Sequence, residues 1–95
     1  MRAARIFYDK AVLPDGAVVE MVIWQLSQIT AERPHGLKYS LFYGRDGQRI
    51  VGYDNELGKG DHKHIFDVQT CYQFVSIEQM VADFLADVER VKNDA

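Results

Sequence analysis

The first half of the chain alternates apolar runs with turn residues, a pattern that predicts antiparallel strands. Residues 5–12, 17–26 and 37–44 are rich in the β-branched and aromatic side chains that favour strands. The Pro-Asp-Gly sequence at 14–16 supplies turn chemistry between the first two runs. Residues 17–26 are apolar on both faces for most of their length, which is typical of a central strand.

A second hairpin is predicted around the Asp-Gly pair at Asp46 and Gly47. This pair favours a tight turn between strands, and residues 49–53 provide the returning strand. The polar residues 27–36 predict a surface loop before this hairpin. Residues 71–75 predict one more short strand.

The last part of the chain changes to a helical period. Apolar residues recur there at the i, i+3, i+4, i+7 spacing of one helical face: Ile77, Met80, Val81, Phe84, Leu85, Val88 and Val91. Ser76 followed by Gln79 has the form of a capping box, which begins a helix. The sequence therefore predicts one α+β domain over residues 1–95, an antiparallel sheet of four to five strands with one C-terminal helix packed on one face.

Size and composition restrict the class of protein. The chain has 95 residues, 47% of them hydrophobic, and a chain of this length forms one small core without room for a large cofactor cavity. Cys71 is the only cysteine, which excludes an intramolecular disulfide, and we expect it to be buried in a strand. The longest apolar run, 17–26, is shorter than the roughly 20 residues of a membrane span. We therefore expect a cytoplasmic protein without signal peptide, membrane span or cofactor.

Charge is distributed unevenly along the chain. Residues 1–65 hold nine Lys and Arg against eight Asp and Glu, whereas residues 66–95 hold two against six. The even mixture of the larger part argues against a general nucleic-acid coat protein and is compatible with a local basic site. The acidic segment 66–95 is interpreted either as a solvated helix face or as a surface for a basic partner.

The segment 53–64 carries more reactive side chains than a connection between strands needs. Its sequence is YDNELGKGDHKH, and long loops without secondary structure are often functional. A solvated connection is the competing interpretation. If the chain is extended there, His62 and His64 project on the same side, and imidazoles change charge near neutral pH.

These residue types suit cleavage of an RNA phosphodiester without a metal. One group removes the proton of the ribose 2′-hydroxyl, another protonates the leaving 5′-oxygen, and a cation stabilises the charge on the phosphate. Either His62 or His64 is the predicted acid or base, and Lys59 is the predicted cation. The other candidate catalytic residues are carboxylates that orient an imidazole or act as the base: Asp54, Glu56 and Asp61. The expected substrate-binding residues are Arg45, Arg49, Tyr53, Asn55 and Lys63.

Other interpretations of single residues are weaker. The two imidazoles with Asp61 form a ligand set for a divalent metal, but no further distant ligand is evident, so no metal is expected. The Gly-Lys-Gly run at 58–60 lacks the neighbouring residues of a phosphate-binding loop. His35 is expected in the loop 27–36, from which it can approach the site. Four aromatic residues are expected in the core: Trp24, Phe42, Phe74 and Phe84.

The sequence resembles the TumE-type toxins of bacterial toxin-antitoxin systems over nearly the whole chain. The runs that carry the resemblance are, in chain order, Val22-Ile23-Trp24, Lys38-Tyr39, Leu41-Phe42-Tyr43, Tyr53-Asp54-Asn55-Glu56, Gly58-Lys59-Gly60-Asp61-His62 with His64, Tyr72-x-Phe74, Ala82-Asp83-Phe84 and Asp87-Val88. The family often has Arg directly before the Tyr of the long run. This chain has Gly52 there, with Arg49 three places earlier.

The resemblance implies a toxin that inhibits growth until a helix-turn-helix antitoxin protein neutralises it. Cleavage of cellular RNA is our hypothesis for the mechanism, motivated by the run of His, Lys and carboxylate residues. The alternative is a non-catalytic binding module that blocks a macromolecular target or regulates through its antitoxin. Nucleotidyl transfer is a weaker hypothesis, since no Gly-Ser element with paired Asp is present. A sheet covered by one helix leaves its other face open, which makes a homodimer a further expectation.

Overall fold

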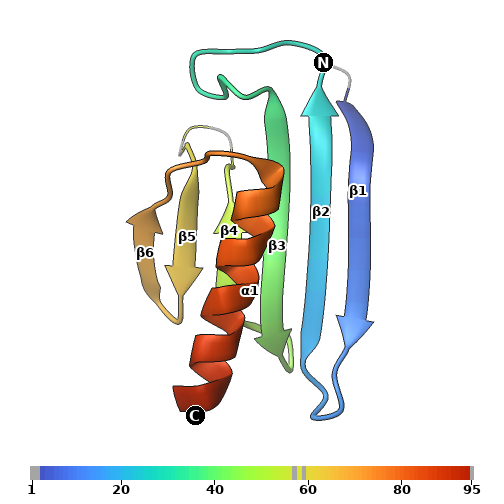
Figure 1. Cartoon of the computed structure of the whole chain (residues 1–95), viewed down its shortest axis with the longest axis vertical. Helices are drawn as coiled ribbons and strands as arrows, with labels where there is room; N and C mark the ends of the chain where they lie inside the picture. Colours follow the sequence, from blue (N-terminus) through green and yellow to red (C-terminus); the bar gives the residue numbers. More distant parts are fainter. Residues whose placement is uncertain (1–2, 57, 59, 95) are drawn as a thin grey trace.

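Each strand of the sheet pairs with the strand that follows it in the sequence. The computed structural model describes residues 3–56, 58 and 60–94. The elements in this part of the chain are β1 (Ala3–Val12), β2 (Val18–Leu26), β3 (Leu37–Arg45), β4 (Gln48–Asp54), β5 (His62–Ile65), β6 (Val68–Cys71) and α1 (Ile77–Asp94). All pairings are antiparallel, in the order β1-β2-β3-β4-β5-β6 (Figure 1). The predicted antiparallel sheet and C-terminal helix are confirmed.

The described residues form six strands, where the sequence predicts four to five. Two of the strands, β5 and β6, are not where the sequence predicts strands. β5 lies in the segment interpreted as a loop. Its sequence, His-Lys-His-Ile, contains a single β-branched residue and so carries little strand signal. The strand forms because it is paired on both sides, with β4 and with β6. Since β6 ends at Cys71, the strand predicted at 71–75 is wrong.

The turn between β5 and β6 explains why the sequence did not indicate this hairpin. Phe66 adopts a φ of 54° there, a left-handed conformation that is uncommon for a bulky residue. The Phe66 N–H donates to the carbonyl of Ile50 at 2.7 Å, which ties the turn to β4. Tertiary hydrogen bonding, rather than a Gly or Asn in the turn, therefore supports the hairpin.

The helix begins where the capping signal places it. The Ser76 hydroxyl oxygen accepts a hydrogen bond from the backbone N–H of Gln79 at 3.1 Å, as an N-cap residue does. The side chain of Gln79 donates to Asp83 at 2.7 Å, one helical turn further on. Ile77 is the first helical residue, and the predicted helix is confirmed.

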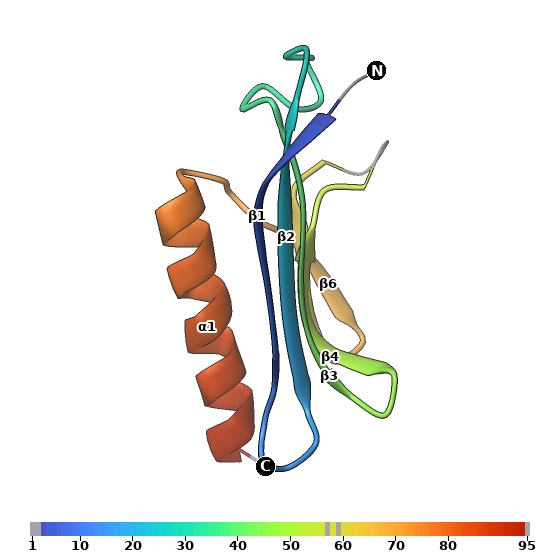
Figure 2. The same cartoon turned by 90° about the vertical axis from the view of Figure 1, so that its right-hand side faces the viewer.

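Helix α1 covers one face of the sheet (Figure 2). Residues two apart along a strand share a face, and on this face they are apolar. Burial of each large apolar side chain stabilises the fold by roughly 1.5–3 kcal/mol. The buried core consists of Ala17, Met21, Ile23, Leu37, Tyr39, Leu41, Tyr43, Val51 and Tyr53 from the strands and their turns, with Met80, Phe84 and Val88 from α1.

The opposite face of the sheet carries no second layer of described residues. Phe42, Gly52 and His64 lie side by side on this uncovered face, because directly paired residues point to the same side. Trp24, next to the buried Ile23 in β2, also points to this side. Trp24 and Phe42 are half-buried, so their predicted place in the core is wrong.

The expectations for three other side chains have different outcomes. Phe84 is fully buried, which confirms its predicted place in the core, and Phe74 is half-buried against the core. Cys71 is exposed at the end of the edge strand β6, so its predicted burial is wrong. The helix in the described residues lacks the apolarity of a membrane span.

Candidate functional site

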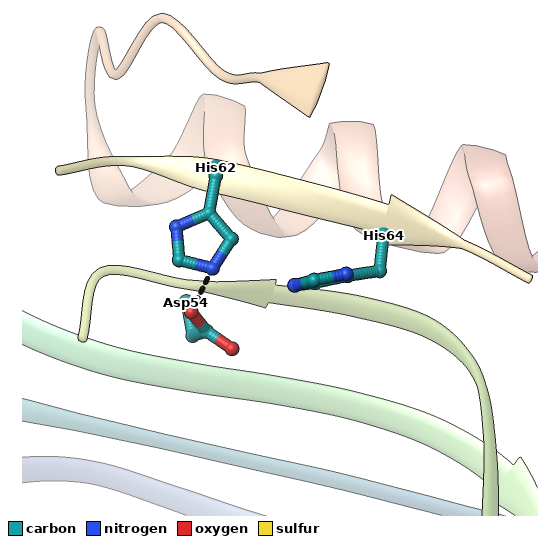
Figure 3. A group of neighbouring side chains, drawn as sticks. All are labelled: Asp54, His62 and His64. Atoms are coloured by element: carbon teal, nitrogen blue, oxygen red, sulfur yellow. Dashed lines mark ion pairs between the residues drawn. The ribbon is translucent and has the colours of Figure 1, made fainter. Parts of the chain in front are cut away.

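Three side chains from β4 and β5 meet on the uncovered face (Figure 3). Asp54 is the cross-strand partner of His62, and His64 lies two residues further along β5, so all three point to the same side. One carboxylate oxygen or ring nitrogen from each side chain lies within 4.8 Å of the others. The two imidazole rings are 5.0 Å apart in an edge-to-face arrangement. We call Asp54, His62 and His64 the β4–β5 cluster.

His62 is held between two oxygen atoms. Its side chain is 4% exposed, with Nε2 at 2.5 Å from Asp54 Oδ1 and Nδ1 at 2.9 Å from the carbonyl oxygen of Gly60. Asp54 Oδ1 is buried and accepts no hydrogen bond from the described residues, although it lies this close to His62 Nε2. The geometry therefore leaves a buried carboxylate oxygen beside a ring nitrogen, an arrangement that favours a cation between them.

Arg49 reaches the cluster across Gly52. Its Nη1 atom lies 4.0 Å from Asp54 Oδ2, on the side of the carboxylate away from His62. A Cβ atom at position 52 would lie 2.5 Å from Arg49 Cδ. The glycine therefore leaves room for the Arg49 side chain to pass over position 52 toward Asp54. Arg49 thus places a positive guanidinium beside the Asp54 carboxylate.

Tyr53 and Lys63, two predicted substrate-binding residues, point to the opposite face, under the helix. The Tyr53 hydroxyl donates to Asp87 of α1, and Lys63 Nζ donates to the same carboxylate at 3.2 Å. Burial, followed by the hydrogen bond to Asp87, raises the pKa of Tyr53. These contacts join the sheet to the helix, and neither residue lies in the cluster.

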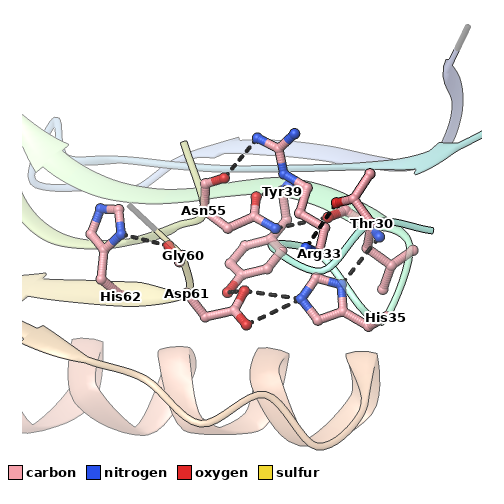
Figure 4. A network of polar contacts seen from close by, with 9 residues as sticks. Thr30, Arg33, His35, Tyr39, Asn55, Gly60, Asp61 and His62 are labelled. Carbon is pink, nitrogen blue, oxygen red and sulfur yellow. Dashed lines mark hydrogen bonds and ion pairs between the residues drawn. The ribbon is translucent and has the colours of Figure 1, made fainter. Parts of the chain in front are cut away.

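Asp61 belongs to a second polar network, at the end of the sheet (Figure 4). It accepts hydrogen bonds from His35 at 3.0 Å and from the Tyr39 hydroxyl at 2.7 Å. The Leu37 N–H donates to His35 Nδ1 at 3.1 Å, so Nε2 carries the ring proton. Burial and the hydrogen bond to Asp61 raise the pKa of Tyr39. Asp61 thus joins two loops to the core, and the structure does not bring it to the cluster.

Asn55 has a similar structural place in that network. Its side chain is buried, accepting from the Tyr39 N–H at 3.0 Å and donating to the Leu37 carbonyl at 2.7 Å. The Asn55 carbonyl accepts from Arg33 Nη2 at 2.8 Å. These three hydrogen bonds are internal to the fold, and together they fix the chain directly after Asp54.

The other predicted site residues lie apart from the cluster or outside the described residues. Glu56 is exposed after the end of β4. Arg45 pairs with Asp15 at 2.5 Å where the first two hairpins meet. Lys59 is not among the described residues. Of the predicted residues, the structure therefore brings together Asp54, His62, His64 and Arg49.

Comparison with known proteins agrees with the resemblance carried by the sequence motifs. A family model described as Toxin TumE matches residues 2–92. The chain belongs to the TumE toxin family. Curated proteins and solved structures gave no match. The toxin is thus assigned to a toxin-antitoxin system, and the family implies an antitoxin partner.

Sequence reasoning missed several residues that build the toxin's site. Gly60 orients His62 through its carbonyl, and Gly52 makes room for Arg49. The buried Arg33 fixes the chain after Asp54 from the loop 27–36, in which His35 and not Arg33 was singled out from the sequence. The missing Arg before Tyr53 was the available signal, because it directed attention to Gly52 and Arg49 together.

Proposed function

We propose that this toxin inhibits growth by cleaving cellular RNA at the β4–β5 cluster, without a metal in the reaction. The supporting observation is that Asp54, His64 and Arg49 are gathered on a sheet face that no described element covers. Attack of a ribose 2′-hydroxyl on the adjacent phosphate requires a base, an acid and a cation. The carboxylate, the imidazole and the guanidinium supply these three groups.

Burial assigns different tasks to the two imidazoles. His62 is almost completely buried and contacts Asp54, so it positions that carboxylate and stabilises its negative charge. Asp54 Oδ1 faces His62 and is buried, while the Asp54 side chain as a whole is 26% exposed, so Oδ2 is the oxygen that remains for substrate. His64 is half-buried beside it. Substrate therefore meets Asp54 and His64 rather than His62.

The proposed reaction is an attack of the ribose 2′-oxygen on the adjacent phosphorus. Asp54 Oδ2 accepts the 2′-hydroxyl proton as the 2′-oxygen bonds to phosphorus. The bond from phosphorus to the 5′-oxygen breaks, and protonated His64 donates its proton to that oxygen. Arg49 stabilises the negative charge on the other phosphate oxygens. The products are a 2′,3′-cyclic phosphate and a 5′-hydroxyl end.

The uncovered face also has the side chains that hold single-stranded RNA. Phe42 in β3 is the cross-strand partner of Gly52 in β4, which in turn is paired with His64 in β5, so an aromatic side chain lies on the same face as His64 with only glycine between them in the register. Trp24 and the exposed Lys38 are paired with each other further along the same face. Aromatic rings stack on bases and cations bind phosphates, a combination typical of sheets that bind RNA strands.

The partner and compartment are part of the same proposal. We propose that the antitoxin is a helix-turn-helix protein and that the toxin acts in the cytoplasm, where cellular RNA is located. Glu78 and Glu89 are exposed on α1 and are available to a basic partner, whereas Asp87 is buried in the core contact with Tyr53. Co-purification of the product of the neighbouring gene, and its loss after Glu78→Lys and Glu89→Lys, tests this surface.

The test of RNA cleavage compares residues of the cluster with a matched residue outside it. The toxin variants His64→Gln, Asp54→Asn and Arg49→Ala are induced briefly, and RNA ends and growth are measured. We expect new 2′,3′-cyclic phosphate ends with the native toxin and a loss of about 10²-fold or more in His64→Gln. Arg45→Ala is the control for Arg49→Ala, because both are exposed arginines near the β3–β4 turn and only Arg49 reaches Asp54.

Two results would contradict the proposal. One is unchanged cellular RNA during growth arrest by the native toxin. The other is full toxicity of folded His64→Gln and Asp54→Asn proteins. Growth arrest without RNA cleavage would support the alternative function, a module that binds and blocks its target.

A further inference from the structure

We propose that the β4–β5 cluster is a binding site for one divalent transition metal ion of the Zn²⁺ class. Asp54, His62 and His64 each offer one ligand atom, and these atoms lie within 4.8 Å of one another. Two imidazoles and one carboxylate are a common set of ligands for catalytic zinc and related ions. The ligands come from two paired strands, so the backbone holds them in place before any ion binds.

The distances require small side-chain movements only. Ligands about 2.0–2.2 Å from a tetrahedral ion are about 3.3–3.6 Å from one another. The contact between His62 Nε2 and Asp54 Oδ1 must open from 2.5 Å, and the widest separation in the cluster must close from no more than 4.8 Å. Rotation of the half-buried His64 and Asp54 side chains is sufficient, because β4 and β5 remain paired.

The second hydrogen bond of His62 is the one that zinc-binding histidines make. A histidine that binds a metal through one ring nitrogen commonly donates its other N–H to a carboxylate or a backbone carbonyl. His62 Nδ1 lies 2.9 Å from the Gly60 carbonyl oxygen. Nε2 of the same ring lies 2.5 Å from Asp54 Oδ1, and this buried oxygen accepts no hydrogen bond from the described residues. A cation bound between these two atoms satisfies both.

A second contact between histidine and aspartate in the described residues, His35 with Asp61, has a different arrangement. His35 receives a backbone N–H on Nδ1 and donates from Nε2 to Asp61. One ring proton satisfies all of these contacts. At His62 the Nδ1 atom faces the Gly60 carbonyl. The Asp54 oxygen beside Nε2 is buried and accepts no hydrogen bond from the described residues, so this pair has an unsatisfied acceptor that the His35–Asp61 pair does not have.

The ligand types and the nearby charge set the expected selectivity. Imidazole ligands favour Zn²⁺ and Co²⁺ over Mg²⁺ and Ca²⁺, which bind mainly oxygen. Three protein ligands leave one tetrahedral position for water. The Arg49 guanidinium lies 4.0 Å from Asp54 Oδ2 and repels a cation there, so Arg49→Ala is expected to bind the ion more tightly than the native chain.

Metal binding and RNA cleavage are expected to exclude each other. The ion occupies Asp54 and the ring nitrogen of His64, which are the atoms that exchange protons with RNA in the proposed reaction. The metal-loaded toxin is then inactive, and a chelator restores cleavage. This consequence rests on the proposed function, whereas the metal site itself does not.

The metal site is tested on the full chain without RNA. Chelator-treated protein is titrated with Zn²⁺ by calorimetry and with Co²⁺ by visible absorption, which reports tetrahedral coordination. We expect one ion per chain, and a loss of affinity of about tenfold or more in His64→Gln and Asp54→Asn. Cys71→Ser is the control for sulfur ligation, because Cys71 is an exposed thiol and the cross-strand partner of His62 in β6.

The outcomes separate the two proposals. Failure to bind Zn²⁺ and Co²⁺, or binding that disappears in Cys71→Ser, overturns the metal site and leaves RNA cleavage untouched. If a cluster variant does not fold, X-ray absorption of the zinc-loaded native chain decides: nitrogen and oxygen neighbours support the site, and sulfur neighbours overturn it. Metal binding with no cleavage in either form supports the site and contradicts the proposed function. Cleavage that increases with the metal overturns the predicted inhibition.

Discussion

The side chain of Arg49 crosses directly over Gly52, the residue that comes before the core tyrosine Tyr53. From there Arg49 Nη1 lies 4.0 Å from Asp54 Oδ2. A Cβ at position 52 would come within 2.5 Å of Arg49 Cδ. The chain thus has glycine directly before Tyr53 and supplies the cation from three residues earlier. The two positions therefore act as one unit.

This relationship predicts that Gly52→Ala impairs activity through Arg49. The new methyl group displaces the Arg49 side chain from Asp54, so toxicity is expected to fall about as far as it does in Arg49→Ala. Stability should change by about 1–2 kcal/mol, because the displaced atom belongs to a flexible side chain. Growth arrest and urea unfolding measure the two effects.

A double-mutant cycle provides the control for this prediction. In the combined variant Gly52→Ala with Arg49→Ala, the methyl group meets no arginine, so the two effects should not add. Additive losses of toxicity would contradict the coupling between the two positions.

The predictability of the fold differed between strands for a physical reason. The strands with β-branched and aromatic residues were predicted from their own composition. β5 was not, because His62–Ile65 is held by pairing with neighbours on both sides and by a turn with Phe66 at positive φ. Non-local hydrogen bonds of this kind leave no signal in the residues that they order.

The candidate site was predictable in part. The spacing of His62 and His64 already indicated two imidazoles on one side. Their carboxylate partner depends on the register of β4 with β5, which pairs Asp54 with His62 and cannot be obtained from local sequence. Asp61 is adjacent to His62 in sequence, and its hydrogen bonds to His35 and Tyr39 hold it away from the cluster.

Asp87 is predicted to be the most sensitive polar residue of the helix. Its buried carboxylate accepts from Tyr53 and Lys63, so Asp87→Ala leaves a hydroxyl and an ammonium group without their partner and should destabilise the fold by about 2–4 kcal/mol. Arg90→Ala is the control: Arg90 contacts the same carboxylate at 2.8 Å from a side chain that is 62% exposed, and should cost at most about 1 kcal/mol. Equal losses in urea unfolding would contradict this ranking.

Lys63 offers a related prediction about function. Because its ammonium group lies under the helix, Lys63→Met should lower stability and leave RNA cleavage per folded molecule unchanged. Cleavage assays at a temperature where the variant is folded provide the measurement. A loss of cleavage as large as that of Arg49→Ala would place Lys63 at the substrate after all.

Gly44 is predicted to be required for packing at the irregularity in β3. A Cβ at this position would lie 2.3 Å from the Gln48 carbonyl oxygen and 2.6 Å from Phe42 Cζ. Since a backbone atom cannot rotate away, Gly44→Ala should destabilise the fold by about 2–3 kcal/mol. Gly47→Ala is the comparison: its φ is 76° and nothing lies near a Cβ there, so it carries conformational strain of about 1–2 kcal/mol only. Thermal unfolding that ranks Gly47→Ala as the more harmful change would contradict the packing argument.

Three tyrosines predict a steep loss of stability in alkaline solution. Tyr39, Tyr53 and Tyr72 each donate to an aspartate, and burial followed by that hydrogen bond raises the pKa of each phenol above its ordinary value of 10.0. Below about pH 10 both the folded and the unfolded chain keep these protons. Above it the unfolded chain releases them first, so it binds fewer protons and stability falls as pH rises, by up to roughly 4 kcal/mol per pH unit for the three together.

Urea unfolding between pH 8 and about 11 measures this slope. Tyr72→Phe should reduce the slope by about a third, since one of the three groups no longer titrates, and a slope that is unchanged in this variant would show that Tyr72 does not keep its proton in the folded toxin.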